Sequence, residues 1–163
     1  MGKLYVAYGS NLNKQQMKGR CPEAKFVGTG LLQNYELQFK GSPYGAHATI
    51  APKKGSSVPV GLWMIQSRDE KRLDMYEGYR KTGYRYYDKE QIQVKLPDGC
   101  RAIGMVYIMD QKMDFGQPTP GYYETVKEGY ADCGLDQTVL EQALQSSVEL
   151  AEQRMTDELQ QSW

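Results

Sequence analysis

The sequence has 163 residues, which suits one domain that buries a sizeable core without disulfide or metal cross-links. Its 20 basic and 20 acidic residues cancel and form no long run of one sign, so neither nucleic acid nor an anionic membrane is expected as a partner. The three cysteines are widely spaced without a CxxC pair, and no long apolar stretch occurs, which predicts a cytoplasmic protein with no membrane span and no metal site.

The opening residues predict a strand, a turn and a short helix. Residues 3–7 are a β-prone run that ends in the tetrapeptide Y-G-S-N at 8–11. Asn13 and Gln16 then have the spacing of a capping box, which predicts a short helix that Pro22 closes.

The next segments predict strands. Residues 26–39 mix alternating apolar residues with glycines, as in a bent or bulged strand. Residues 46–51 and 58–65 predict two further strands, separated by a polar turn at 53–57.

A hairpin and two helices complete the predicted elements. The hairpin joins 84–96 to 100–109 around the turn sequence P-D-G, a shorter helix is expected near 121–133, and a longer one runs from 137 to about 158. Because the strands come first and most of the helix comes last, we expect one α+β domain over 1–163 with a mixed, mostly antiparallel sheet that can curl into a barrel.

The last helix carries apolar residues near one stripe, which predicts that it packs on another surface. That surface is either its own barrel or a second subunit of a homodimer. The residues of the stripe are Val139, Ala143, Leu144, Val148, Leu150 and Ala151.

The strand-to-helix turn at 8–11 is the first candidate for a binding site. Gly9 lets a ligand approach the main chain closely, and the start of a helix leaves backbone N–H groups without partners. Such a turn suits a carboxylate or a developing oxyanion. The alternative is a plain β-to-α turn in which Ser10, Asn11 or Asn13 acts only as a cap.

The second candidate is a carboxylate at the end of a predicted helix. Ser67 and Glu70 have capping-box spacing, so a helix is expected from about 68 to 77, with Gly78 as its stop. Leu73 and Glu77 share a face, so a buried Leu73 directs Glu77 toward the core. Burial and the helix dipole would both raise the pKa of Glu77 and suit it for proton transfer. The alternative is a solvated glutamate at a frayed helix end.

Other residues offer little catalytic chemistry. Asp74 points elsewhere on the helical wheel and is interpreted as a surface residue. His47 is the single histidine and is interpreted as a half-buried strand residue, since no GxSxG or other triad motif accompanies it. No glycine-rich nucleotide-binding motif occurs. A thiol enzyme using Cys100 or Cys21 lacks a basic partner in the sequence.

Taken together, these motifs resemble the γ-glutamylcyclotransferase-like family over about four-fifths of the chain. They match in order as Y-V-A-Y-G-S-N-L at 5–12, A-T-I at 48–50, V-G-L-W-M-I at 60–65, L-D-M-Y-E-G at 73–78, G-Y-R-Y-Y at 83–87, C-R-A-I-G-M-V-Y-I-M at 100–109 and P-T-P-G-Y at 118–122. The match fades past about Asp136, so the helix from about 137 is expected to be particular to this branch.

The resemblance implies a mixed β-barrel flanked by helices, with a small-molecule γ-glutamyl substrate in a cavity at the end of the first strand. It implies that Glu77 is the catalytic acid and base and that neither a metal nor a cofactor is needed. It further implies that the substrate is held by Tyr5, Val6, Ala7, Tyr8, Gly9, Ser10 and Asn11, with Tyr107 and Tyr122 as cavity-lining phenols.

The expected reaction releases 5-oxoproline and a free amine or amino acid. Several leaving groups stay open: an amino acid, a γ-glutamyl-linked amine, or a γ-glutamyl-acylated natural product. An alternative from another class is a non-catalytic module of the same fold that binds small ligands.

Overall fold

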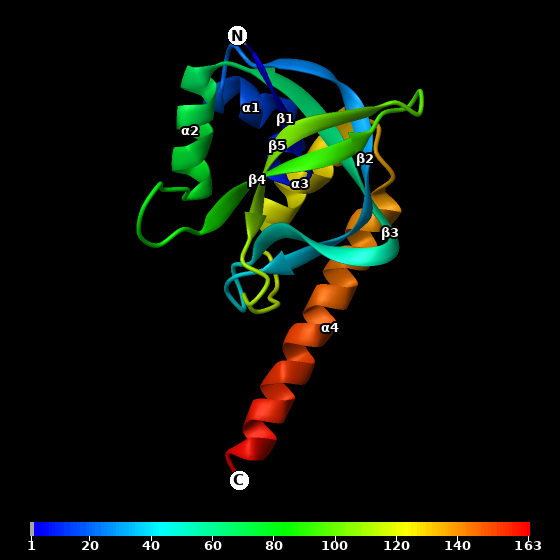
Figure 1. The fold of residues 1–163 in the computed structure, drawn as a ribbon. Helices are drawn as coiled ribbons and strands as arrows, with labels where there is room; N and C mark the ends of the chain where they lie inside the picture. Colours follow the sequence, from blue (N-terminus) through cyan, green and yellow to red (C-terminus); the bar gives the residue numbers. More distant parts are fainter. Residues whose placement is uncertain (1) are drawn as a thin grey trace.

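The computed structural model describes residues 2–163, in which five strands close into a barrel in the order β1-β3-β2-β4-β5 (Figure 1). Neighbouring strands are antiparallel except β1 and β5, which are parallel. The predicted mixed, mostly antiparallel barrel with flanking helices is therefore confirmed. The strands are β1 (Lys3–Ala7), β2 (Lys25–Lys40), β3 (His47–Ile65), β4 (Tyr87–Lys95) and β5 (Arg101–Met109).

Two predicted strands are a single strand, β3, of 19 residues. β2 is long enough to pair with both halves of β3, from Lys25 opposite Met64 to Lys40 opposite His47. The predicted turn at 53–57 therefore does not reverse the chain. It lies beside an irregularity in β2 where Asn34 adopts a positive φ of 64° and accepts a hydrogen bond from the Gly55 amide at 3.1 Å.

Helix α1 (Lys14–Arg20) follows the short 3-10 helix η1 (Ser10–Leu12) and begins as predicted. The side chain of Asn13 accepts a hydrogen bond from the amide of Gln16 at 3.0 Å.

Ser67 and Glu70 were predicted to form the capping box of α2 (Ser67–Glu77), and this was wrong by one residue. The capping box is formed by Gln66 and Asp69. Glu70, the residue expected in that role, is held by Lys3 and Lys89 instead. The helix ends at Gly78, as expected.

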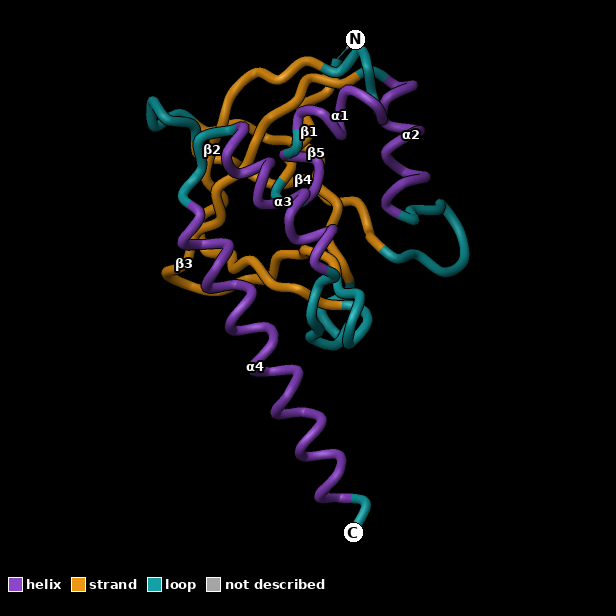
Figure 2. The backbone as a smooth tube through the Cα atoms, turned by 180° about the vertical axis from the view of Figure 1, so that it is seen from behind, coloured by secondary structure: helices purple, strands orange, loops and turns teal. Residues whose placement is uncertain are grey.

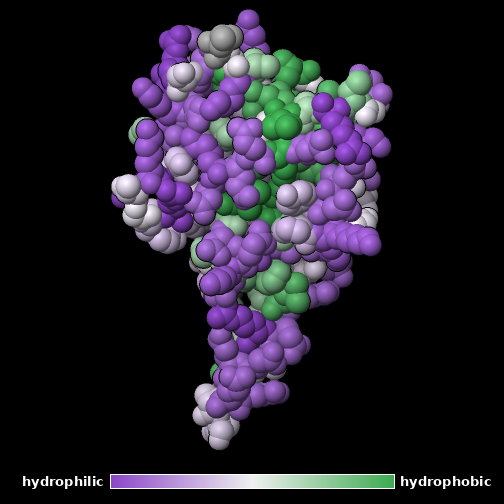
Figure 3. Space-filling model, viewed as in Figure 1, coloured by the Kyte–Doolittle hydropathy of each residue, from purple (hydrophilic) through white to green (hydrophobic). Residues whose placement is uncertain are grey.

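Helix α3 (Pro120–Asp132) packs on η1, and α4 (Gln137–Gln161) packs on β2 and then projects beyond the barrel (Figures 1 and 2). The hydroxyl oxygen of Ser147 accepts a hydrogen bond from the Phe39 amide at 3.0 Å. The first part of α4 therefore packs on its own barrel, while Leu150 from the predicted stripe is 45% exposed. Hydrophilic residues cover most of the projecting end (Figure 3).

The apolar core fills the barrel and extends under η1, α1 and α3. None of the helices in the described part of the chain has the length and apolarity needed to cross a membrane.

Candidate active site

The loop after β1 presents unpaired backbone amides. Gly9 (φ −124°, ψ −130°) precedes η1, and the amides of Leu12 and Asn13 donate to the carbonyl oxygens of Gly9 and Ser10 at 3.1 and 3.0 Å. Within residues 2–163, the amides of Ser10 and Asn11 donate to no protein acceptor, as is usual where a helix begins. These amides are available to a bound carboxylate or oxyanion.

Glu77 is the last residue of α2, and its carboxyl group lies close to this loop. Leu73, one turn earlier, is fully buried, and Glu77 shares its inward face. Oε1 of Glu77 accepts a hydrogen bond from Nδ2 of Asn11 at 3.1 Å. Burial raises the pKa of Glu77 to about 7, against the opposing effects of the Arg20 charge and the Asn11 hydrogen bond. Such a carboxyl group can accept and return a proton near neutral pH.

The side chain of Asn11 is held in one orientation by four hydrogen bonds. Its Nδ2 donates to Glu77 and to the Tyr5 hydroxyl (2.9 Å), while its Oδ1 accepts from Gln16 Nε2 (3.1 Å) and Arg20 Nη1 (3.0 Å). Because both polar atoms of the Asn11 side chain are engaged, this side chain positions the carboxyl group of Glu77. The backbone amide of Asn11 remains free for a ligand.

A narrow inner cavity of about 30 Å³ adjoins a wider outer pocket of about 380 Å³. Both are lined by Ser10, Glu77, Tyr87 and Tyr122, so they meet at the carboxyl group. The inner cavity is further lined by Tyr5, Tyr8, Gly9, Asn11, Ala48 and Tyr107. The outer pocket is further lined by Gln16, Arg20, His47, Met75, Tyr76, Gly78 and Tyr86.

Four buried tyrosines and the half-buried Tyr122 surround the inner cavity as neutral phenols, since burial raises the pKa of each. Three of them donate their hydroxyl hydrogens to the protein: Tyr8 to the carbonyl oxygen of Tyr107 (2.6 Å), Tyr87 to that of Ala48 (2.5 Å), and Tyr107 to Asp74 Oδ1 (2.6 Å).

The other two tyrosines have free hydroxyl hydrogens. The Tyr5 hydroxyl accepts from Asn11, and the Tyr122 hydroxyl accepts from the Ala48 amide at 3.0 Å. Both can therefore donate to a ligand. A Cβ atom on Gly9 would lie 3.4 Å from the Tyr122 hydroxyl and 3.2 Å from Cβ of Ala48, so glycine at this position keeps the cavity open.

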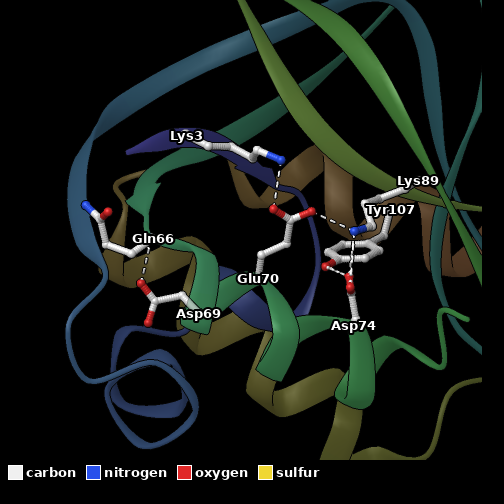
Figure 4. A network of polar contacts seen from close by, with 7 residues as sticks. All are labelled: Lys3, Gln66, Asp69, Glu70, Asp74, Lys89 and Tyr107. Carbon is white, nitrogen blue, oxygen red and sulfur yellow. Dashed lines mark hydrogen bonds and ion pairs between the residues drawn. The ribbon is translucent and has the colours of Figure 1, made fainter. Parts of the chain in front are cut away.

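A network of charged side chains ties α2 to the barrel (Figure 4). Glu70 pairs with Lys3 at 2.7 Å and with Lys89 at 2.6 Å, and Lys89 also pairs with Asp74 at 3.0 Å. Asp74 was predicted to be a surface residue, and this was wrong: it accepts a hydrogen bond from the Tyr107 hydroxyl and joins the helix that carries Glu77 to the cavity wall.

Most of the predicted site residues lie around the same inner cavity: Tyr5, Tyr8, Gly9, Ser10, Asn11, Glu77, Tyr107 and Tyr122. Val6 and Ala7 are buried in the core and line neither space. His47 is half-buried, as predicted, and its Nδ1 lies 2.8 Å from the Tyr86 hydroxyl. Sequence reasoning missed Arg20 as a pocket residue, because no local pattern shows that α1 lies beside α2.

The raised pKa of Glu77 predicts how stability depends on pH. The pKa of Glu77 is about 7 in the folded protein and ordinarily 4.5. Between pH 4.5 and pH 7 the folded protein therefore keeps a proton on Glu77 that the unfolded chain has largely lost. The contribution of Glu77 to stability therefore decreases as the pH rises from 4.5 through 7. We expect Glu77→Gln to be more stable than the wild type at pH 8, with the difference shrinking toward pH 4, in urea titrations across this range. An equal difference in stability between the two proteins at pH 4 and at pH 8 would contradict the burial of the Glu77 carboxyl group.

Comparison with known proteins gives a consistent result. The sequence model of the family described as "Gamma-glutamyl cyclotransferase, AIG2-like" matches residues 5–130. The γ-glutamylcyclotransferase of Homo sapiens is 30% identical over 139 residues, covering 81% of this chain and 72% of its own length, and that of Mus musculus is 30% identical over 141 residues, covering 82% and 73%. A solved structure of a γ-glutamyl cyclotransferase superposes with a TM-score of 0.78 at 27% identity, covering 88% of this chain and 86% of its own.

These likenesses, together with the barrel and its carboxyl-bearing cavity, define an enzyme of the cyclotransferase class. The chain belongs to the γ-glutamyl cyclotransferase, AIG2-like family.

Proposed function

We propose that this protein cleaves γ-glutamyl amides by internal cyclisation, releasing 5-oxoproline and a free amine or amino acid. The observation that carries the proposal is the position of Glu77: its carboxyl group has a pKa near 7 and lies where the inner cavity meets the outer pocket. The names of the relatives support the γ-glutamyl part of the substrate.

The reaction begins with the substrate's α-ammonium, which loses a proton to the ionised carboxylate of Glu77. The freed amine attacks its own γ-carbonyl carbon and closes a five-membered ring, a step favoured because both groups belong to one short chain. The amides of Ser10 and Asn11 stabilise the tetrahedral oxyanion. Glu77 then returns the proton to the departing nitrogen as the amide bond breaks. The second proton of the attacking nitrogen passes to the freed amine, which leaves a neutral lactam.

The two spaces divide the substrate between them. The narrow inner cavity receives the polar end of the γ-glutamyl group, for which the Tyr5 and Tyr122 hydroxyls supply hydrogen bonds. The wider outer pocket receives the leaving group. Glu77 lines both, so it can reach the attacking nitrogen and the departing one in turn.

The test is product release from a panel of γ-glutamyl compounds that carry amino acid, simple amine and acylated natural-product leaving groups. We expect equal amounts of 5-oxoproline and free amine from at least one of them. Release of glutamate in place of 5-oxoproline would show hydrolysis and contradict cyclisation. Binding without any release would favour the non-catalytic module.

A further inference from the structure

Arg20, the last residue of α1, lines the outer pocket next to Glu77. Helices α1 and α2 lie side by side (Figure 1), and the guanidinium carbon of Arg20 lies 4.3 Å from the centre of the Tyr76 ring on α2. Nη1 of Arg20 donates to Asn11 Oδ1 at 3.0 Å. These two contacts hold the planar guanidinium in place while leaving several of its N–H donors unused.

This half-buried cation has no carboxylate partner in the described part of the chain. No carboxylate oxygen of residues 2–163 lies within 4.0 Å of the Arg20 guanidinium, whereas Arg68, Arg85 and Arg154 each pair with an acid. Among the described residues, Glu77 is the one acidic residue that lines the outer pocket. Burial favours the neutral form of His47, another lining residue, by lowering its pKa. A fixed arginine in such a pocket favours an anionic ligand and disfavours a cationic one.

We propose that Arg20 binds a carboxylate on the leaving group, so that the enzyme selects γ-glutamyl amides of amino acids or peptides over those of simple amines and polyamines. This inference rests on the proposed function. Arg20 lines the outer pocket and not the inner cavity, which places its charge on the leaving-group side of Glu77. Planar, two-donor recognition by a guanidinium matches a carboxylate.

The same contacts couple leaving-group binding to the catalytic carboxyl. The positive charge of Arg20 lowers the pKa of Glu77 against the larger effect of burial. A carboxylate bound to Arg20 would offset that charge and make Glu77 a stronger base. We therefore expect the acidic limb of the kcat profile to lie at higher pH for a substrate with a carboxylated leaving group than for one without it.

The experiment compares γ-glutamylalanine with γ-glutamylethylamide, which differ only in the leaving group's carboxylate. In the wild type, kcat/KM for γ-glutamylalanine should exceed that for the ethylamide by about tenfold to a hundredfold, as expected for hydrogen bonds to a charged group. In Arg20→Gln this ratio should fall to about one, whereas Arg20→Lys should keep part of it because the charge remains. Lys18→Gln, which removes an exposed charge from the same helix, should leave the ratio unchanged.

The ratio separates this role from others. If Arg20 only positions Asn11, or binds the α-carboxylate of the γ-glutamyl group, Arg20→Gln will slow both substrates by the same factor and the ratio will persist, which overturns the inference. Equal turnover of both substrates by the wild type would also overturn it while leaving the cyclotransferase reaction intact. Absence of 5-oxoproline from both substrates and from the wider panel would instead overturn the proposed function itself.

Discussion

Replacing Glu77 by glutamine is expected to lower kcat by a factor of about 10² to 10⁴, the range of general acid–base catalysis. Glutamine has the same shape, and its Oε1 can still accept the hydrogen bond from Asn11 that the carboxylate accepts at 3.1 Å. Substrate binding should therefore change little, while the proton acceptor is lost. Steady-state assays of 5-oxoproline release, with urea unfolding to check the fold, measure both effects.

Glu90→Gln serves as the matched control for Glu77→Gln. Glu90 is an exposed carboxylate on β4, so its substitution makes the same change in charge outside the cavity, and its kcat should equal that of the wild type. Retention of more than half of the wild-type turnover by Glu77→Gln would exclude Glu77 as the acid and base.

Gly129→Ala is expected to lower the free energy of unfolding by about 1–3 kcal/mol, the usual cost of overpacking. Gly129 is buried where α3 packs on η1, and an added Cβ atom would lie 2.6 Å from the backbone nitrogen of Asn13 and 2.7 Å from Cβ of Leu12. These contacts are too close, so α3 must move away from η1 and from the Y-G-S-N loop that leads into it. Because the loop carries the free amides, we also expect kcat/KM to fall.

Gly121→Ala on the same helix provides the comparison for Gly129→Ala. Apart from its chain neighbours and the backbone of its own helix, no heavy atom of the described residues lies within 4 Å of the position that its Cβ would occupy, so only the helix propensity of alanine acts there. We expect an unchanged or slightly increased stability, by at most about 1 kcal/mol. Urea midpoints of the two variants measure the difference. Equal midpoints would mean that α3 and η1 are not packed as tightly as the structure shows.

The network on α2 gives Glu77 a fixed position without taking part in the proposed reaction. Hydrogen bonds from Lys3 and Lys89 to Glu70 outweigh its burial and lower its pKa, so it stays ionised. Lys89 also pairs with Asp74, which accepts the Tyr107 hydroxyl. A helix held this way cannot shift its last residue without breaking several contacts at once.

The local sequence determined where most elements begin and end. Asn13 and Gly78 act at helix ends as their residue types predict, because caps depend on neighbouring residues alone. The joining of 47–65 into one strand did not follow from that segment, since its continuity depends on β2, a partner distant in the chain. Glu70 was expected to complete a capping box with Ser67, but lysines from β1 and β4, which are distant in the chain, pair with it instead.

For the site, the sequence by itself determined that a glutamate would end a helix on the same face as a buried leucine, and that a glycine turn would follow the first strand. Only the tertiary structure decided that the glutamate and the glycine turn meet, that Asn11 joins them, and that Arg20 lies beside Glu77 with none of the described carboxylates within ion-pair distance. The physical reason is that a pKa and an unpaired charge depend on desolvation and on every neighbouring group, and most of these neighbours come from distant parts of the chain.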